Sequence, residues 1–118
     1  MTKLIDVTHS DFSEHVLESD LPVLVDFTAY WCPPCRRAIP ILEELAADYS
    51  GRVKIVEVDT DQQPQLVARY GVQAMPTLLI FRHGQEIERL VGLRTKAAYR
   101  ATLDQILAAQ PVPMLSSI

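Results

Sequence analysis

The sequence predicts an α/β layered fold, because strand-like apolar runs alternate with helix-like amphipathic stretches from its start to about residue 108. Its 118 residues fit one domain that can bury a core of its own. Apolar residues make up 48% of the chain and charged residues 22%, a balance typical of globular rather than disordered chains. We therefore expect one domain over residues 1–109 and an irregular tail over residues 110–118, where Pro111 and Pro113 lie.

Two strands and a helix are predicted before the cysteines. A short strand covers Leu4–Val7, and a helix follows over about Ser10–Glu18 with Ser10 as its N-cap. Val23–Phe27 is apolar on both faces except at Asp26, as expected for a central strand that helices cover on both sides. The apolar face of the helix carries Phe12, Val16 and Leu17.

A long helix is predicted after the cysteines, and Gly51 ends it. Pro40 lies inside this helix and predicts a kink. The apolar stripe that faces the core consists of Ala38, Ile41, Leu42, Leu45, Ala46 and Tyr49.

The second half of the chain predicts a strand, a helix, a β-hairpin and a last helix. Val53–Val58 has the pattern of a buried strand, and Thr60 or Asp61 can cap a helix that Gly71 ends. The apolar residues of that helix are Leu66, Val67 and Tyr70. The remaining elements are the strand Thr77–Phe81, a turn at His83-Gly84, the strand Glu86–Val91, and a helix capped by Thr95 that ends at Ala108.

Charge and hydropathy argue against two classes of partner. The formal net charge is -4 and the isoelectric point is about 5.2, and Lys and Arg form no basic stripe, so nucleic acid is not expected to bind. No apolar run reaches the roughly 18 to 20 residues that span a bilayer, and the N-terminus lacks the pattern of a secretory signal. We therefore expect a cytoplasmic protein that binds neither nucleic acid nor membranes.

The only two cysteines lie in the segment Trp31-Cys32-Pro33-Pro34-Cys35, between the central strand and the long helix. Free backbone N–H groups and the helix dipole stabilise an anion at a helix N-terminus, so we expect Cys32 to be the attacking thiolate. Cys35 lies one helical turn later, within reach of the Cys32 sulfur but more enclosed, so we expect it to be the resolving thiol. The prolines stiffen the bend without removing a needed hydrogen bond in the first helical turn.

Three other uses of this cysteine pair are weighed against redox chemistry. A structural disulfide that closes so short a loop would stabilise the fold by only about 2 kcal/mol. A zinc site needs about four ligands, and the histidines of this chain lack ligand spacing. Two inert buried thiols are the third possibility, and tandem prolines at a strand-to-helix junction are an odd setting for them. Redox chemistry is the favoured interpretation.

Asp26 and Pro76 are two further candidates. A carboxyl group in the middle of an apolar strand keeps its proton more tightly than a solvated one, unless Asp26 lies at a wet sheet edge. The Met75-Pro76 bond can be cis, which suits a tight turn, or trans at the start of a strand. The residues alone leave both alternatives open.

These motifs together resemble the thioredoxin family. The resemblance covers residues 3 to 108, and a C-x-P-C motif joined to an upstream acid and a downstream Pro-Thr pair is specific. It implies a thioredoxin fold, with a five-stranded mixed sheet flanked by four helices. The matching residues are Asp26, Trp31-Cys32, Pro34-Cys35, Pro40, Asp61, Met75-Pro76-Thr77, Gly84 and Gly92.

The resemblance also implies roles for individual residues. Asp26 would accept the proton of Cys35, and Met75-Pro76 would form a cis-proline loop beside the cysteines. The backbone of Met75 would pair with the substrate chain as a short added strand. The substrate-binding residues implied are Trp31, Pro33, Pro34, Met75, Pro76 and Gly92.

The function expected on this basis is the reduction of disulfides in other proteins by dithiol-disulfide exchange through Cys32 and Cys35. The chain has no glycine-rich dinucleotide fingerprint, so we expect no bound cofactor and a separate thioredoxin reductase that restores the dithiol. We expect a monomer that binds no metal. The alternatives are a disulfide oxidase or isomerase of higher potential and a non-catalytic binding module.

The chain departs from the common family pattern at four positions. Pro33 stands where Gly is usual, so the bend is stiffer and the reduction potential is not fixed by the resemblance. Thr28 and Tyr30 change the surface around the tryptophan. Glu57 stands where bacterial members have a lysine, and its charge is expected to raise the pKa of Asp26. The neighbouring pair Arg36-Arg37 is interpreted as a solvated helix face and kept out of the site.

Overall fold

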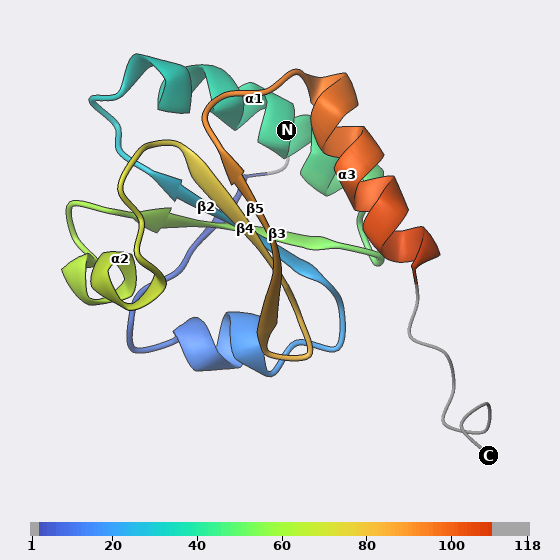
Figure 1. Ribbon diagram of the computed structural model, residues 1–118, viewed down its shortest axis with the longest axis horizontal. Coiled ribbons are helices and arrows are strands. Elements are labelled where there is room, and N and C mark those ends of the chain that lie inside the picture. Colours follow the sequence, from blue (N-terminus) through green and yellow to red (C-terminus); the bar gives the residue numbers. More distant parts are fainter. Residues whose placement is uncertain (1–2, 110–118) are drawn as a thin grey trace.

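The computed structural model describes residues 3–109, and the predicted tail over residues 110–118 lies outside them. Its helices and strands alternate along the chain as far as β4, which β5 follows directly in a hairpin (Figure 1). In order they are β1 (Ile5–Asp6), the π-helix η1 (Ser13–Leu17), β2 (Val23–Thr28), α1 (Pro33–Asp48), β3 (Lys54–Asp59), α2 (Pro64–Tyr70), β4 (Thr77–Arg82), β5 (Gln85–Val91) and α3 (Lys96–Ala108).

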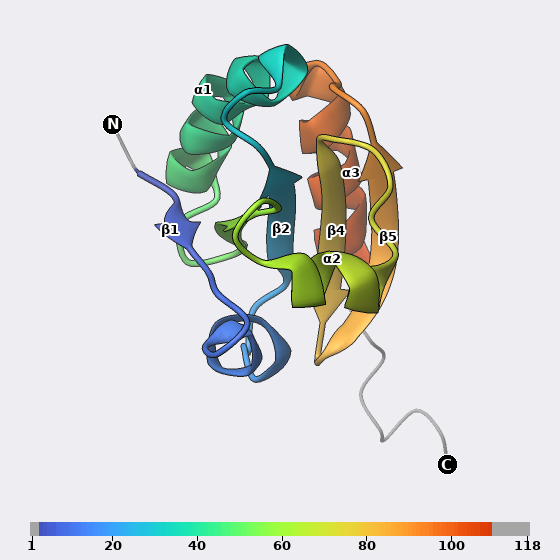
Figure 2. The ribbon, with the colours of Figure 1, turned by 90° about the vertical axis from the view of Figure 1, so that its left-hand side faces the viewer.

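The five strands of the described residues form one mixed sheet in the order β1-β3-β2-β4-β5. β1, β3 and β2 run parallel, whereas β4 pairs antiparallel with both β2 and β5. Figures 1 and 2 show α1 and α3 on one face of the sheet and η1 and α2 on the other. The sheet with its four helices confirms the predicted fold class, with β2 as the central strand.

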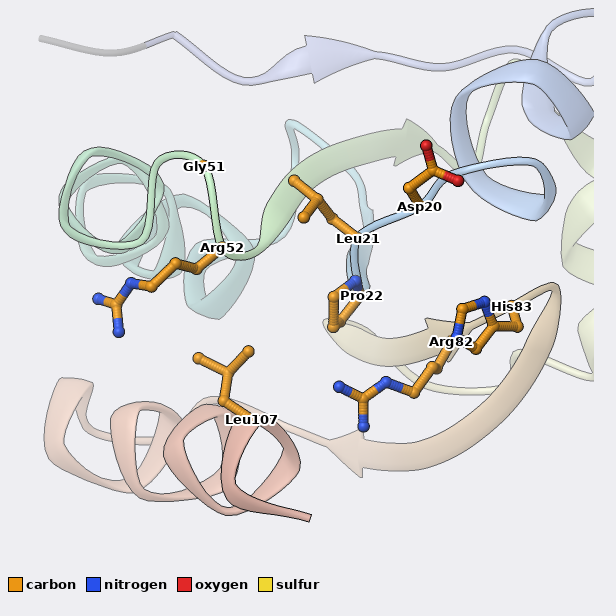
Figure 3. Close-up of a pocket in the computed structure, with 8 residues that line it drawn as sticks. All are labelled: Asp20, Leu21, Pro22, Gly51, Arg52, Arg82, His83 and Leu107. Carbon is orange, nitrogen blue, oxygen red and sulfur yellow. The ribbon is translucent and has the colours of Figure 1, made fainter. Parts of the chain in front are cut away.

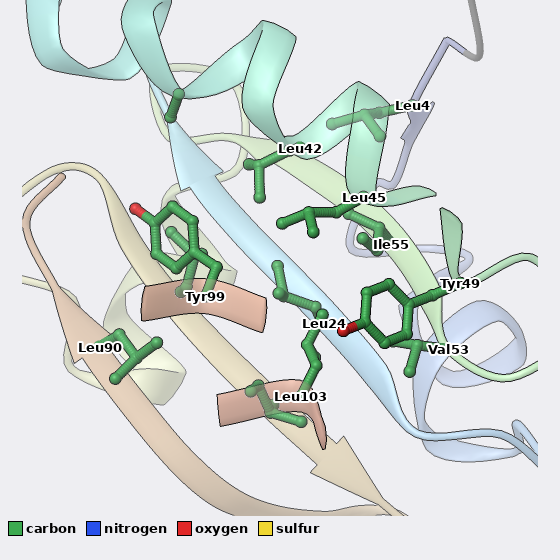
Figure 4. Packing of buried hydrophobic residues seen from close by; sticks show 13 residues of the cluster. Leu4, Leu24, Leu42, Leu45, Tyr49, Val53, Ile55, Leu90, Tyr99 and Leu103 are labelled. Atoms are coloured by element: carbon green, nitrogen blue, oxygen red, sulfur yellow. The ribbon is translucent and has the colours of Figure 1, made fainter. Parts of the chain in front are cut away.

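The core has two parts, one on each face of the sheet. Side chains alternate along a strand, so Leu24 of β2 packs with α1 and α3, whereas Val25 and Phe27 pack with η1 and α2. Figure 4 shows the first part, to which the helices contribute Leu42, Leu45, Tyr99 and Leu103. Because both faces are covered, β2 is buried along its whole length.

α1 confirms the long helix predicted after the cysteines. It runs without interruption from Pro33 to Asp48 with Pro40 inside it, and the kink at Pro40 stays a prediction. Gly51 follows the helix in the left-handed conformation, with φ of 84°. Within the predicted stripe, Ala38, Leu42, Leu45 and Tyr49 are buried, and Ile41 and Ala46 are partly buried against them.

The first helix begins later than predicted, and Ser10 does not cap it. The side chain of Asp11 accepts a hydrogen bond from the backbone N–H of Thr8 at 2.7 Å, which holds this stretch in a turn. The Ser10 hydroxyl lies 2.9 Å from that of Thr8, and η1 begins at Ser13 after Phe12. The predicted apolar face is confirmed, since Phe12 and Val16 are buried and Leu17 packs against them.

The cap predicted for the next helix is also wrong. α2 begins at Pro64 after Gln63, whose side chain makes no capping hydrogen bond, because Thr60 and Asp61 lie too early and bind other segments. A proline suits this first helical position, where its missing N–H costs nothing. The predicted end is confirmed, since Gly71 adopts the left-handed conformation.

The hairpin and the last helix have the predicted turn and cap. His83 and Gly84 both have positive φ, 51° and 79°, as a two-residue turn between twisted strands requires. The Thr95 hydroxyl accepts a hydrogen bond from the backbone N–H of Ala98 at 3.1 Å at the start of α3. The first strand is shorter than predicted, since β1 covers only Ile5–Asp6.

Candidate active site

Both cysteines lie where β2 ends and α1 begins, as the sequence predicts. Cys32 is the N-cap of α1, and Pro33 and Pro34 are its first two residues. Both thiols are free, and the exposed fractions of Cys32 and Cys35 are 5% and 0%. The only route by which a partner sulfur can reach this pair is therefore the small exposed part of Cys32.

The Cys32 sulfur lies between two backbone groups. The backbone N–H of Cys35 donates a hydrogen bond to Cys32 Sγ at 3.3 Å, and the Cys32 thiol donates to the carbonyl of Met75 at 3.8 Å. An N–H directed at a sulfur at a helix N-terminus stabilises negative charge on that sulfur. The first turn of α1 therefore directs a backbone hydrogen-bond donor at the Cys32 sulfur.

The Cys35 thiol has the opposite environment. Burial, together with its hydrogen bond to Cys32, raises the pKa of Cys35 to about 11. At neutral pH this thiol therefore keeps its proton.

Asp26 lies on the central strand and has no exposed surface, so it does not lie at a wet sheet edge. Neither carboxyl oxygen has a hydrogen-bond partner within residues 3–109. The pKa of Asp26 is raised to about 8, mainly by burial and to a smaller extent by the charge of Glu57. Asp26 and Leu24 are two residues apart on β2, so their side chains point to the same face of the sheet. This is the face that α1 covers.

Glu57 is the β3 residue paired with Asp26 in the parallel register. It is half-buried, and burial together with the charges of Asp6, Glu43 and Asp59 raises its own pKa. Paired residues on neighbouring strands point to the same side of a sheet, so the two carboxyl groups share one face. This geometry supports the expected influence of Glu57 on Asp26.

Replacing Glu57 with lysine is expected to lower the pKa of Asp26 below about 8, because an attractive charge would replace a repulsive one beside a buried acid. The pKa can be followed through the carboxyl carbon signal of Asp26 in NMR titrations of both proteins. Asp20→Lys makes the same charge change at an exposed position and should leave that pKa unchanged. An equal or higher Asp26 pKa in Glu57→Lys would contradict the expected influence.

The loop before β4 completes the surroundings of Cys32. The Met75-Pro76 peptide bond is cis, and the Met75 side chain packs against Ala29 and both cysteines. The backbone N–H of Gly92 donates to the Pro76 carbonyl at 2.8 Å. The structure thus brings together Met75, Pro76, Gly92 and the cysteines, which are distant in the sequence.

Two aromatic side chains lie on the surface beside Cys32. Trp31 is 53% exposed, and its indole N–H donates to the carboxylate of Asp61 at 2.7 Å. Tyr30 is 79% exposed, and Arg36 donates to its carbonyl at 2.8 Å. Apolar rings of this size offer a flat contact surface to a partner.

Sequence reasoning missed two of these contacts. Arg36 was assigned to a solvated helix face, yet its guanidinium binds the loop that precedes Trp31. The Thr60 hydroxyl lies 3.0 Å from the Met75 sulfur and also donates to the Thr28 carbonyl. The position of Arg36 in the first turn after the cysteines was the one available signal, since an arginine there can fold back over the N-terminal loop.

A cavity of about 490 Å³ lies at the other end of the sheet, where β2 and β3 begin and β4 ends (Figure 3). It is lined by Asp20, Leu21, Pro22, Gly51, Arg52, Arg82, His83 and Leu107. The cysteines and Asp26 are not among them, so this cavity does not coincide with the candidate chemistry. A partner must meet Cys32 on the surface rather than inside this cavity.

Among residues 3–109, no group of three or more His, Cys, Asp or Glu side chains is arranged to hold a metal ion. In the same part of the chain, no helix combines the length and apolar character needed to cross a membrane.

The thioredoxin family model matches residues 3–105, which is most of the chain. The chain belongs to the thioredoxin family. It is 45% identical to thioredoxin 1 of Nostoc sp. over 91% of this chain and 100% of the relative. It is 46% identical to thioredoxin 1 of Synechococcus elongatus over 86% of this chain and 94% of the relative. The thioredoxin of Synechocystis sp. is 42% identical over 91% of this chain and 100% of its own length.

Membership of the thioredoxin family and the close cysteine pair support one activity. The protein is a thiol-disulfide oxidoreductase of the protein-disulfide reductase type, and this interpretation is favoured over an oxidase, an isomerase or a binding module. The family match therefore agrees with the chemistry that the two sulfur environments allow.

Proposed function

We propose that this protein reduces disulfides in other proteins, with Cys32 as the nucleophile, Cys35 as the resolving thiol and Asp26 as the proton acceptor. The observation that carries the proposal is the hydrogen bond from the Cys35 N–H to Cys32 Sγ at 3.3 Å. This hydrogen bond stabilises negative charge on the Cys32 sulfur, whereas burial keeps the Cys35 thiol protonated.

The reaction has two exchange steps. The Cys32 thiolate attacks one sulfur of the partner disulfide, so that a mixed disulfide forms and the second partner sulfur leaves as a thiolate. Cys35 then gives its proton to the Asp26 carboxylate and attacks Cys32 Sγ, which expels the first partner sulfur. Two electrons have passed to the partner, and a Cys32–Cys35 disulfide remains.

Asp26 suits the second step because of its environment. With a pKa of about 8, a useful fraction of this carboxyl group is ionised near neutral pH, and the group is a stronger base than a solvated aspartate. Proton transfer from Cys35, whose pKa is about 11, is therefore less unfavourable than transfer to an ordinary carboxylate.

Substrate proteins are proposed to bind across the exposed surface around Cys32. The backbone of Met75 would pair with an extended substrate segment, since its carbonyl already faces the Cys32 sulfur at 3.8 Å. The side chains and backbone that would contact the segment are those of Trp31, Pro33, Pro34, Met75, Pro76 and Gly92.

The remaining proposals concern the cellular setting. A separate thioredoxin reductase would return the Cys32–Cys35 disulfide to the dithiol, with no cofactor bound to this chain. The catalytic unit would be a cytoplasmic monomer formed by residues 1–109. Support comes from the family match and from the acidic, scattered charge of the sequence.

Equilibration with glutathione tests whether the pair acts as a reductant. We expect a reduction potential near the roughly -270 mV of thioredoxins, measured by alkylating the free thiols at set ratios of reduced to oxidised glutathione. Cys35→Ser, which cannot form the internal disulfide, is the control. A value near the roughly -180 mV of protein disulfide isomerase would support an oxidase or isomerase instead.

A further inference from the structure

The side chain of Arg89 crosses from β5 to the end of α2. Its guanidinium donates to the carbonyl of Tyr70 at 2.6 Å and lies 3.5 Å from the carbonyl oxygen of Gly71. Carbonyl groups in the last turn of a helix lack intrahelical partners, and the helix dipole makes this end negative. Arg89 therefore supplies both a hydrogen-bond donor and a positive charge where α2 needs them.

Glu86 holds this guanidinium in a fixed orientation. Its two carboxylate oxygens accept hydrogen bonds from Arg89 Nε at 2.9 Å and from Nη2 at 3.0 Å. A two-point contact of this kind restricts rotation of the planar guanidinium. Arg89 is also paired with Leu79 of β4, which places it on the face of the sheet where α2 lies.

The segment that follows α2 ends beside Cys32 in the folded protein. After Gly71 the chain continues to Met75, whose carbonyl faces the Cys32 sulfur, and to Pro76. At this far end, Gly92 donates its N–H to the Pro76 carbonyl at 2.8 Å. β5 and the residue after it therefore fix both ends of the loop over residues 71–76, one through Arg89 and the other through Gly92.

We infer that Arg89, oriented by Glu86, is a positioning residue that sets the loop over residues 71–76 for binding a polypeptide substrate. The inference rests on the proposed function, because it assumes that the substrate pairs with the backbone of Met75. Arg89 acts through the end of α2 and has no contact with the reacting sulfurs. Its loss should therefore weaken the binding of a polypeptide and leave the exchange chemistry unchanged.

Kinetics with two substrates test this inference. With insulin as substrate, Arg89→Ala is expected to raise KM about 3- to 10-fold, as the loss of one or two hydrogen bonds would, with little change in kcat. Arg89→Lys keeps a charged donor for Tyr70 and should restore most of the affinity. Reduction of the small disulfide 5,5′-dithiobis(2-nitrobenzoate) needs no added strand, so its rate should stay the same in both variants.

Glu88→Ala is the matched control, because Glu88 is an exposed acid on the same strand that points to the other face of the sheet. It should leave both substrates unaffected. An unchanged KM for insulin in Arg89→Ala, with only a lower melting temperature, would overturn the inference and leave a purely structural role.

Amide NMR spectra separate this inference from the proposed function. The signals of Val72, Gln73 and Ala74 should shift in Arg89→Ala and not in Glu88→Ala, whether or not the protein reduces insulin. Unshifted signals would overturn the positioning role. If the wild-type protein reduced neither insulin nor the small disulfide, the proposed function would be overturned. The spectra would still decide the role of Arg89.

Discussion

Replacing Cys32 with serine is expected to abolish the reduction of protein disulfides, with turnover lowered at least about 1,000-fold. A serine hydroxyl does not ionise near neutral pH, and Cys35 cannot substitute because it is fully buried and its pKa is raised to about 11. Insulin reduction in the presence of dithiothreitol measures the loss. The same substitution should prevent any covalent link to a partner.

Replacing Cys35 with serine is expected to have a different outcome. Cys32 would still attack, but the mixed disulfide could not be resolved, so partner proteins would stay attached to Cys32. Non-reducing electrophoresis and mass spectrometry of a disulfide-containing protein mixed with each variant measure this trapping. The double variant Cys32→Ser/Cys35→Ser is the control. Equal trapping by the two single variants would contradict the assignment of nucleophile and resolving thiol.

Replacing Asp26 with alanine is expected to stabilise the protein, with the largest gain at alkaline pH. The pKa of this carboxyl group is raised from 3.8 in the unfolded chain to about 8 in the folded protein. The folded state therefore holds a proton that the unfolded state releases, and the stability of the wild-type protein falls as pH rises from about 4 through about 8. A shift of this size corresponds to roughly 6 kcal/mol above pH 8, and a small cavity left by the substitution offsets about 1 kcal/mol.

Urea unfolding of wild-type protein and Asp26→Ala between pH 4 and pH 9 measures this difference. The gain in the free energy of unfolding should be small near pH 4 and reach roughly 5 kcal/mol at pH 9. Asp20→Ala removes an exposed carboxylate and should show no such trend. A gain that does not vary with pH would contradict the raised pKa.

The same substitution should slow catalysis, because Cys35 would lose its proposed proton acceptor. We expect the mixed disulfide to persist longer in Asp26→Ala, most clearly at neutral pH where solvent hydroxide is scarce. Rapid quenching with acid followed by mass spectrometry measures the lifetime of this intermediate. In the proposed mechanism, Asp26 thus serves the reaction although its burial destabilises the fold.

The centre of the fold could be predicted because its signals are local. The run Val23–Phe27 is apolar on both faces, and only a strand covered on both sides has that composition. Asp26 stands out against this background, and its burial follows from the strand alone. Two prolines directly after Cys32 likewise mark the start of α1, since a proline fits the first helical turn.

The wrong predictions arose where distant segments compete for a side chain. Thr60 and Asp61 are residue types that commonly cap helices, but Thr60 donates to the carbonyl of Thr28 and Asp61 accepts from Trp31. Thr28 is the last residue of β2, and Trp31 lies in the loop that follows it. Propensity and spacing carry no information about such contacts, so the start of α2 could not be located from them.

The role inferred for Arg89 could not be predicted from the sequence either. A charged residue on an edge strand is common, because charge there discourages pairing with other chains. Its contact with the Tyr70 carbonyl spans 19 residues of sequence and involves a backbone atom, which no side-chain pattern reveals. Only the folded structure, which brings the end of α2 within reach of the Arg89 side chain on β5, reveals the contact.

The loop over residues 71–76 is attached to β5 and Gly92. This attachment separates the proposed substrate-binding loop from the sulfur chemistry in space. The sulfurs and their acid belong to the central strand β2 and to α1, whereas the loop is held from the margin of the sheet. Under the role inferred for Arg89, substitutions at that margin would change which proteins are accepted and leave the electron-transfer step intact.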